Sequence, residues 1–433
     1  MRIDVFNASG NKIYDRMMES KTANELLLFF LRKESAELIP VKLAQLSKED
    51  LDAVVHKANR HRVTSLLYQT LSTPHLEPIV PASITQALRS AYLETVWWNT
   101  SLYSELSKIL KVLQDENIPV ILLKGAHLAK IIYGNIALRP MSDIDIMVKK
   151  KDLRQSVNLL FQIGFTVTNE KQVKLITNNY QLPPHFKHFP DLTNGKICLD
   201  VHSSIAEEAQ SYKIDIDGLW TRAWSTETTG LETLTLSPED LLLHLCLHTS
   251  MHHMFTNGLK SFCDIREVIR YHNDEINWDE LQLRARSWRA SNPVYLSLHL
   301  AKSLLNADIP QWVLEALKPD KPDNQAIIWA KEQIFATSDK EVIYPKELLH
   351  FWKKKSSLQK ISILLERTFP PRKELAQMYY ISPASSRVYF YYPVRLKEIF
   401  QRHFHKTLRL LYQDKETLSL VDRQLGLIDW LSH

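Results

Sequence analysis

Residues 138–148 read Leu-Arg-Pro-Met-Ser-Asp-Ile-Asp-Ile-Met-Val, and this stretch decides which fold and chemistry the chain can support. Asp143 and Asp145 are separated by one apolar residue within an alternation that is typical of a β-strand. A strand sends every second side chain to the same face, so both carboxylates are expected to point the same way. Two such acids repel each other unless a cation lies between them, and Mg²⁺ prefers this kind of oxygen site. A solvated acidic face on an edge strand is the alternative interpretation.

The residues before the acidic pair predict a buried strand and a helix joined by a tight turn. Residues 118–123 form a continuous apolar run, and residues 127–133 have a helix-like pattern. Lys124-Gly125-Ala126 stands between them. A glycine at this turn would let the backbone approach a ligand, and the N–H groups of the helix start would attract a phosphate. Lys124 would add a positive charge, although these three residues taken alone favour an ordinary tight turn over a phosphate site.

A third strand is predicted after the acidic pair. Residues 197–202 read Ile-Cys-Leu-Asp-Val-His, so Asp200 and His202 share one face of this strand. The strand would supply a third carboxylate and an imidazole.

Taken together, the strand, glycine turn, helix, Asp-x-Asp strand and later acidic strand resemble the nucleotidyltransferase superfamily built on the DNA polymerase β-like fold. The closer likeness is to its large, mostly uncharacterised bacterial branch, and it spans about residues 40–410, with the motifs in 122–202 and 237–264. The resemblance implies an α+β fold that is mostly α overall. In it, a small mixed β-sheet nucleotidyltransferase core is flanked by N-terminal and C-terminal helical regions.

The resemblance also implies the site residues. Asp143, Asp145 and Asp200 match the catalytic, metal-binding acids, which would hold Mg²⁺ or Mn²⁺ with an NTP as donor. Around these acids, further residues are expected to bind the NTP and its metal ion. They are Lys124, Gly125, Ala126, Arg139, Ser142, His202, His248, Lys260 and Asp264. The Gly-Ser phosphate turn of the superfamily is Gly125-Ala126 in this chain, so the hydroxyl contact to phosphate is missing.

The expected activity is transfer of a nucleoside monophosphate from an NTP to a hydroxyl or phosphate of a small-molecule or peptide acceptor, with release of pyrophosphate. A protein AMP-transferring regulator, an RNA 3′-end nucleotide-adding enzyme and a catalytically silent nucleotide-binding scaffold are the alternatives. RNA addition calls for a strongly basic cleft, whereas the net charge is only +5 over 433 residues, so nucleic acid is not the expected partner. Neither the choice among ATP, GTP, CTP and UTP nor the oligomeric state follows from the sequence.

Composition narrows the class of protein. The chain is 45% hydrophobic and 24% charged, and its 9 glycines against 19 prolines favour a largely helical chain of two or three domains. No apolar run approaches the roughly 18 residues that span a bilayer, and the N-terminus lacks the pattern of a signal peptide. Cys198, Cys246 and Cys263 are interpreted as reduced, buried thiols, which makes the cytoplasm the expected location. Walker A, His-Glu-x-x-His and Gly-x-Gly-x-x-Gly motifs are absent, which excludes the enzyme classes that depend on them.

Three regions are predicted: an N-terminal helical region (1–105), the nucleotidyltransferase α/β core (106–230) and a C-terminal helical domain (231–433). In the first, residues 47–50 form a capping box, and residues 84–114 predict a helix whose Trp97 and Trp98 belong to the core. In the second, residues 151–163 predict a helix and 164–168 a strand. Residues 180–194 predict an irregular strand or flap, whose histidines face the substrate or lie in a surface loop.

The C-terminal region is predicted to begin with a helix at Ser237-Pro238-Glu239-Asp240. His244, His248 and His252 follow at four-residue spacing, but no third ligand accompanies a pair, so zinc is not expected. We expect His248 near the mouth of the site and His244 in the core. Lys260 and Asp264 are interpreted either as an exposed ion pair or as residues that bind the nucleotide phosphate or the substrate. The basic segments 353–355 and 395–409 are solvated faces or a foothold for an anionic partner.

Overall fold

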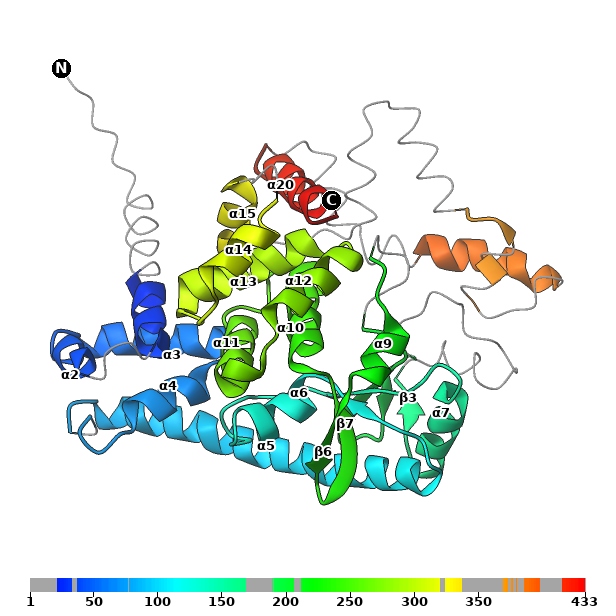
Figure 1. Ribbon diagram of the computed structural model, residues 1–433, viewed down its shortest axis with the longest axis horizontal. Coiled ribbons are helices and arrows are strands. Elements are labelled where there is room, and N and C mark those ends of the chain that lie inside the picture. The colour runs from blue at the N-terminus through cyan, green and yellow to red at the C-terminus, as the bar shows by residue number, and fades with distance from the viewer. Residues whose placement is uncertain are drawn as a thin grey trace. The chain divides into compact units, whose positions relative to one another are not determined.

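A computed structural model describes residues 22–32, 37–76, 78–168, 189, 191–205, 212–319, 324–336, 369–372, 375–376, 379, 385–397 and 415–432. The chain divides into two compact units (Figure 1). The first comprises residues 1–166, 185–322 and 330–337, and the second comprises 167–184, 323–329 and 338–433. Three predicted features lie outside the described residues: the histidines of the 180–194 flap, the basic run 353–355 and most of the basic segment 395–409.

One seven-stranded sheet is the centre of the fold, with strand order β3-β4-β5-β2-β1-β7-β6. The strands are β1 (Ile121–Leu122), β2 (Ile144–Met147), β3 (Thr166–Val167), β4 (Leu192–Thr193), β5 (Cys198–His202), β6 (Trp224–Thr228) and β7 (Leu231–Thr235). β2 runs parallel to β5 and β1 runs parallel to β7, while the pairs β1–β2, β4–β5 and β6–β7 are antiparallel. The mixed sheet and the many helices confirm the predicted α+β class with mostly helical content.

Two of the predicted strands exist but are shorter than their apolar patterns. The run 118–123 contributes the two residues of β1, and 164–168 contributes the two residues of β3. All four residues of β2 are buried, because Ile144 and Ile146 pack on one face while the alternate positions face the other. The acidic strand therefore lies in the middle of the sheet and not at a solvated edge.

The hairpin of β6 and β7 was not predicted from the sequence. Its two turn residues, Thr229 and Gly230, have φ values of +59° and +80°, which is the left-handed backbone that a tight two-residue hairpin requires. β7 then pairs with β1. The sheet thus includes residues 231–235, beyond the predicted core boundary at 230; the three-region division stays a prediction.

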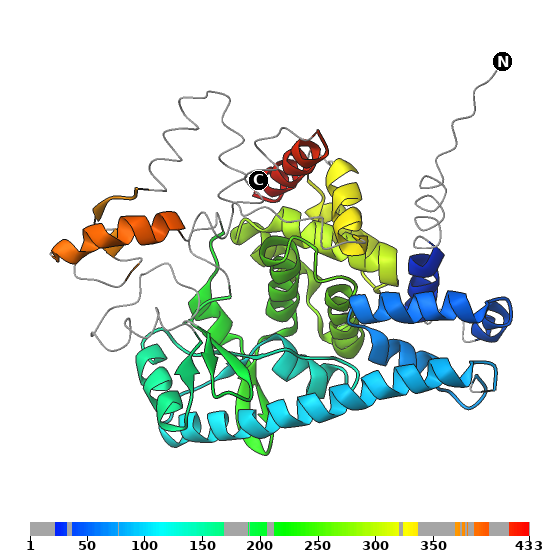
Figure 2. The same cartoon turned by 180° about the vertical axis from the view of Figure 1, so that it is seen from behind.

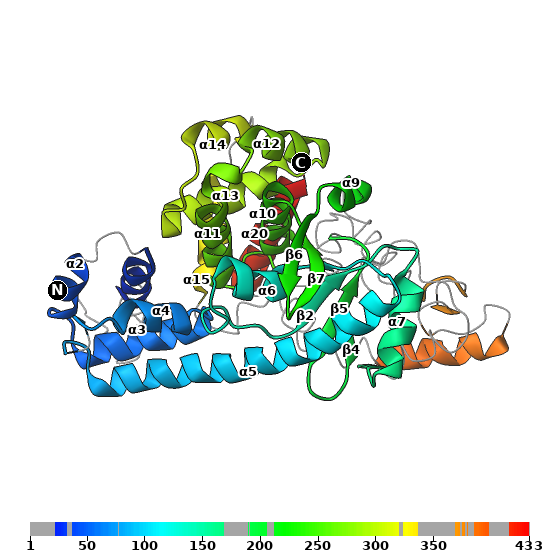
Figure 3. The same cartoon turned by 60° about the horizontal axis from the view of Figure 1, so that its bottom comes forward.

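Helices surround the sheet in the first unit. They are α2 (Leu38–Leu43), α3 (Lys48–Arg60), α4 (Thr64–Leu71), α5 (Ala82–Asp115), α6 (Lys124–His127), η1 (Leu128–Ile132), α7 (Leu153–Gln162), α9 (Ile216–Thr221), α10 (Pro238–Leu247), η2 (His248–His252), α11 (Lys260–His272), η3 (Asn273–Glu275), α12 (Trp278–Ser287), α13 (Ser291–Leu305) and α14 (Gln311–Leu317). α10, α11 and α13 pack against one another, and α5 packs along α4 (Figure 2). Figure 3 shows α5 running past the strands, with α10, α11 and α13 on the opposite side.

Several helix starts agree with the sequence patterns. Ser47 caps α3 in a capping box with Asp50, and the Ser237 hydroxyl accepts from the Asp240 N–H at the start of α10. α5 covers the predicted helix 84–114, but the assignment of Trp97 to the core is wrong, because this side chain is 72% exposed. Helical spacing alone cannot tell which face of a long helix a single tryptophan occupies.

The second unit contains η4 (Ser386–Phe390) and α20 (Lys415–Ser432), and α15 (Asn324–Phe335) spans residues of both units. Its own small apolar core consists of Leu375, Ala376, Tyr379 and Val388. Over the described ranges, no helix is both long and apolar enough to cross a membrane.

The three cysteines are free thiols, as predicted. Cys246 and Cys263 are buried, but Cys198 on β5 is exposed, so the prediction of three buried thiols is wrong for Cys198.

Candidate active site

The three predicted metal-binding carboxylates line one cavity, of about 160 Å³, in the first unit. Asp143 lies immediately before β2, Asp145 within β2, and Asp200 within β5. Asp145 and Asp200 are direct partners in the parallel register of β2 and β5, and Met147 is the partner of His202. Alternation along both strands therefore brings the acidic residues to the same face, as the Asp-x-Asp and Asp-x-His spacings predict.

Asp145 is buried and has two charged or chargeable neighbours. The Lys124 Nζ lies 2.6 Å and the His202 Nε2 lies 2.9 Å from its Oδ1. Burial opposes ionisation of Asp145, but the ammonium and the imidazole outweigh it and hold the pKa of Asp145 below its ordinary value. Asp145 is therefore a permanent carboxylate in the middle of the sheet.

The other two acids are shifted in the opposite direction. Burial, followed by the charges of Asp145, Asp191 and Asp143, raises the pKa of Asp200 to about 7. Burial and the Asp145 charge also raise the pKa of Asp143, whose Oδ1 accepts a hydrogen bond from Ser142 Oγ at 3.0 Å. The carboxylates of Asp143, Asp145 and Asp200 thus repel one another, and a divalent cation between them would relieve this repulsion.

Two groups of potential metal ligands occur among the described residues. Asp145, Asp200 and His202 form the first, with ligand atoms all within 4.8 Å of one another. His248, His252 and His253 form the second. The first group offers mainly oxygen atoms and fits Mg²⁺ or Mn²⁺, with Asp143 beside it on the same cavity.

The Lys124-Gly125-Ala126 turn differs from its prediction in one respect. The helix begins at Lys124 itself, with φ at +41°, spans only the four residues of α6 and continues as the π-helix η1. Gly125 lines the cavity, but a Cβ there would lie 2.6 Å from Arg139 Nη1 and 2.9 Å from Met141. Packing against these side chains therefore explains the glycine without any approach of a ligand to its backbone. Ala126 is buried outside the cavity lining, where its carbonyl accepts from the Tyr103 hydroxyl.

Arg139 and Asp264 form a buried ion pair at the back of the cavity. Arg139 Nε and Nη2 donate to the two oxygens of Asp264 at 3.0 and 2.9 Å, and the Tyr133 hydroxyl donates to Oδ1 at 2.9 Å. Lys260 Nζ lies 3.8 Å from Asp264. Asp264 is buried and the Lys260 side chain is only 13% exposed, so the interpretation of this pair as exposed is wrong. Because Asp264 holds the Arg139 guanidinium in two hydrogen bonds, Arg139 positions the loop before β2.

The pKa of Lys260 lies below the ordinary value of a lysine. Burial and the Arg139 charge lower it to about 8, against the opposing effect of Asp264. Lys260 and Lys124 are thus two amines on the walls of a cavity that four acidic residues also line.

Helix α5 holds the segment that leads into the acidic strand. The Asn99 amide group donates to the carbonyls of Ile136 and Arg139, and its oxygen accepts from the Met141 N–H. The Trp98 indole donates to the Met141 carbonyl at 2.9 Å. Nothing in the local sequence of α5 indicates these contacts, because the partners lie about 40 residues away along the chain. The available signal is an Asn on the apolar face of an amphipathic helix, since such a side chain needs hydrogen-bond partners once it is buried.

The histidines after α10 lie on the cavity wall. His248, His252 and His253 line the cavity, whereas His244 is buried in the core, where it was expected. Burial, followed by the Lys124 charge and the neighbouring histidines, lowers the pKa of His248. His253 was missed, because it is adjacent to His252 and outside the four-residue spacing.

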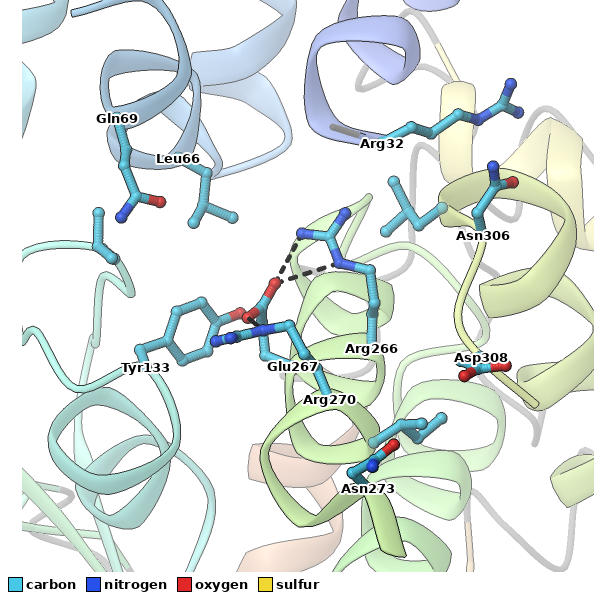
Figure 4. A pocket seen from close by; sticks show the side chains of 13 residues that line it. Arg32, Leu66, Gln69, Tyr133, Arg266, Glu267, Arg270, Asn273, Asn306 and Asp308 are labelled. Carbon is cyan, nitrogen blue, oxygen red and sulfur yellow. Dashed lines mark hydrogen bonds and ion pairs between the residues drawn. The ribbon is translucent and has the colours of Figure 1, made fainter. Parts of the chain in front are cut away.

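A second cavity, of about 480 Å³, is lined in part by residues of α11 (Figure 4). Its walls include Tyr133 and the ion-paired side chains of Arg266, Glu267 and Arg270. Tyr133 lines this cavity, and its hydroxyl donates to Asp264, which lines the first cavity. None of the residues predicted for the site lines it.

Comparison with known families matches residues 47–306 to a family described as uncharacterised nucleotidyltransferase. The match covers more than half of the 433-residue chain. The chain belongs to this nucleotidyltransferase family. The matched range contains β1, β2, β5, α10 and α11, and so every residue of the candidate site.

The other comparisons add little. No curated protein matches the chain significantly. Among solved structures, the solution structure of the antibiotic-resistance factor ANT(2'')-Ia matches with a TM-score of 0.31 and 14% identity, over 43% of this chain and 91% of that one. At this level of similarity we draw no conclusion from it about fold or function.

Proposed function

We propose that this protein uses Mg²⁺ or Mn²⁺ to transfer a nucleoside monophosphate from an NTP to a hydroxyl or phosphate of a small-molecule or peptide acceptor. The observation that carries the proposal is the convergence of Asp143, Asp145 and Asp200 on one cavity, with Asp145 and Asp200 in direct register. Membership of a nucleotidyltransferase family supports the reaction class.

Asp145 and Asp200, with Asp143 and His202 beside them, would hold the cation. When bound, such an ion neutralises charge on the phosphates and on the attacking and leaving oxygens. Lys124 and Lys260 would pair with the phosphate oxygens, and the Lys124 ammonium would exchange its contact with Asp145 for one with the donor. Charges that are already oriented toward the reacting group cost little reorganisation as the transition state forms.

In the transfer itself, the acceptor oxygen forms a bond to the α-phosphorus while the bond from that phosphorus to pyrophosphate breaks. Asp200 would receive the acceptor's proton, or would lower the pKa of the acceptor hydroxyl through the cation that it helps to hold. Arg139, held by Asp264, fixes the segment that carries the acidic pair.

The cavity volume indicates that only part of the donor NTP lies inside the cavity. At about 160 Å³ the cavity is smaller than the roughly 300–1,000 Å³ of pockets that enclose a whole ligand. We propose that it receives the phosphates, while the nucleoside lies toward the cavity mouth.

The test is incubation with each labelled NTP, Mg²⁺ or Mn²⁺ and a metabolite or peptide extract, followed by mass spectrometry for a nucleotidyl adduct. Asp145→Asn and Asp200→Asn should each lower turnover by at least about 10²–10³-fold, the typical cost of losing one transition-state-stabilising group. Asp115→Asn, which changes an exposed acid on α5, is the matched control. Wild-type turnover in either site variant, with native folding shown by circular dichroism, contradicts the mechanism.

A catalytically silent nucleotide-binding protein would behave differently. It would bind NTP and form no adduct with any acceptor in the extract, whereas a protein without nucleotide function would show no Mg²⁺-dependent NTP binding by calorimetry.

A further inference from the structure

Three histidines that line the cavity lie in an unusual backbone setting. α10 ends at Leu247 and continues as the π-helix η2, in which the His253 N–H donates to the His248 carbonyl five residues earlier at 3.1 Å. In an α-helix, residues four apart lie above one another, and the wider π-turn brings residues five apart together instead. Insertions of this kind are frequent at functional sites.

The imidazole geometry matches that of shared metal ligands. His248 Nε2 and His253 Nε2 are 3.2 Å apart. Two nitrogens bound to one tetrahedral zinc at about 2.0–2.1 Å lie about 3.3–3.4 Å from each other. The His252 ring stacks on His248 with centroids 5.2 Å apart and meets His253 edge-on at 4.6 Å, and the ligand atoms of all three lie within 4.8 Å.

The backbone after the cluster is held in a strained form. Met254 and Phe255 have φ values of +47° and +65°, which non-glycine residues rarely adopt. Phe255 is fully buried, and its N–H donates to the Thr249 carbonyl at 2.9 Å. The buried phenylalanine therefore anchors the turn and limits how far His253 can move from His248.

We propose that His248, His252 and His253 bind one transition-metal ion of the zinc class. Three imidazoles on a tetrahedral ion leave one position open, and because all three residues line the cavity, that position would face the space shared with the acids. It would take a water or a phosphate or hydroxyl oxygen of a substrate. This nitrogen site is separate from the carboxylate site, because zinc accepts imidazole readily whereas Mg²⁺ prefers oxygen. The inference does not depend on the proposed transfer reaction.

The π-turn explains why the spacing of the sequence argued against zinc. At helical spacing the candidates are His244, His248 and His252, but His244 is directed into the core. The turn replaces His244 by His253 and so completes a set of three ligands on the cavity side.

The first experiment is X-ray absorption spectroscopy of the full-length protein with one equivalent of Zn²⁺ in excess Mg²⁺. We expect three imidazole nitrogens at about 2.0–2.1 Å and one further light atom. A spectrum with one imidazole or none overturns the proposal, since it would place zinc at the Asp145, Asp200 and His202 cluster or at the surface. This measurement needs no variant, so it decides the matter even if a substitution impairs folding.

The second experiment measures Zn²⁺ affinity by competition with a chromophoric chelator. His253→Ala should weaken binding by at least about 100-fold, the upper end of what loss of an outer-shell partner alone costs. Two controls should keep wild-type affinity: His56→Ala, at an exposed position on α3, and Asp200→Asn, at the carboxylate site. Unchanged affinity in His253→Ala, or a loss in Asp200→Asn, refutes the tri-histidine site.

Discussion

The buried ion pair between Arg139 and Asp264 can be used to test how the fold supports the site. In Asp264→Asn the side chain keeps its shape and one oxygen but loses its charge. The Arg139 guanidinium would then remain buried, and the Lys260 ammonium mostly covered, without the carboxylate that faces both of them. The Tyr133 hydroxyl would keep its acceptor only if the new amide oxygen took the place of Oδ1.

The size of the effect follows from burial. The side chains of Arg139 and Asp264 are only 6% and 3% exposed, so water cannot solvate the guanidinium that remains. Removing one partner of such a buried pair typically costs about 3–5 kcal/mol of stability. The same substitution in an exposed pair costs much less, at most about 1 kcal/mol. Asp115→Asn removes such a pair, since Lys111 and Asp115 are 64% and 55% exposed.

Urea unfolding, followed by circular dichroism and tryptophan fluorescence, measures these free energies where the two transitions coincide. The double variant Arg139→Met/Asp264→Asn should be more stable than Asp264→Asn alone, because no unpaired guanidinium remains. A loss below about 1 kcal/mol in Asp264→Asn, or a double variant whose losses simply add, would refute the assignment of this pair as a buried support of the site.

Three further predictions concern single residues. Mg²⁺ affinity should tighten about tenfold between pH 6 and pH 8, because Asp200, with a pKa raised to about 7, binds metal only when deprotonated; calorimetry of wild type and Asp200→Asn checks this, and a flat wild-type profile contradicts it. Gly125→Ala should destabilise the protein by about 1–3 kcal/mol, since the new methyl would crowd Arg139 and Met141; unchanged unfolding in urea would show that both side chains move aside freely. A thiol reagent should modify one cysteine in the native protein and three in urea, because only Cys198 is exposed; modification of Cys198→Ser in the native state would contradict this.

Local patterns predicted those parts of the fold that depend on neighbours in the sequence. The capping box at Ser47 and the cap at Ser237 fixed the starts of α3 and α10, because their hydrogen bonds reach only three residues along the chain. Two-residue alternation placed Asp143 and Asp145, and separately Asp200 and His202, on common faces. These acids lie together because both strands form where the sequence predicted them and because the two strands pair in parallel.

Patterns failed where a partner lies far away in the chain. The exposure of Trp97 and of Cys198, and the burial of the Lys260–Asp264 pair, depend on which elements pack nearby. The same holds for Gly125, whose neighbours Arg139 and Met141 come from the following loop and whose need for a small side chain is therefore steric.

The sequence by itself determined the class of fold, the acidic strands and the nucleotidyltransferase motif, since all of these are written in spacings of a few residues. Only the tertiary structure decided that Asp145 faces Asp200 across a parallel pair, that Asp264 holds Arg139 over 125 positions of chain, and that a π-turn joins His253 to His248. The physical reason is that side-chain charge, burial and metal-ligand geometry depend on distances in space, and those distances exist only once the chain has packed.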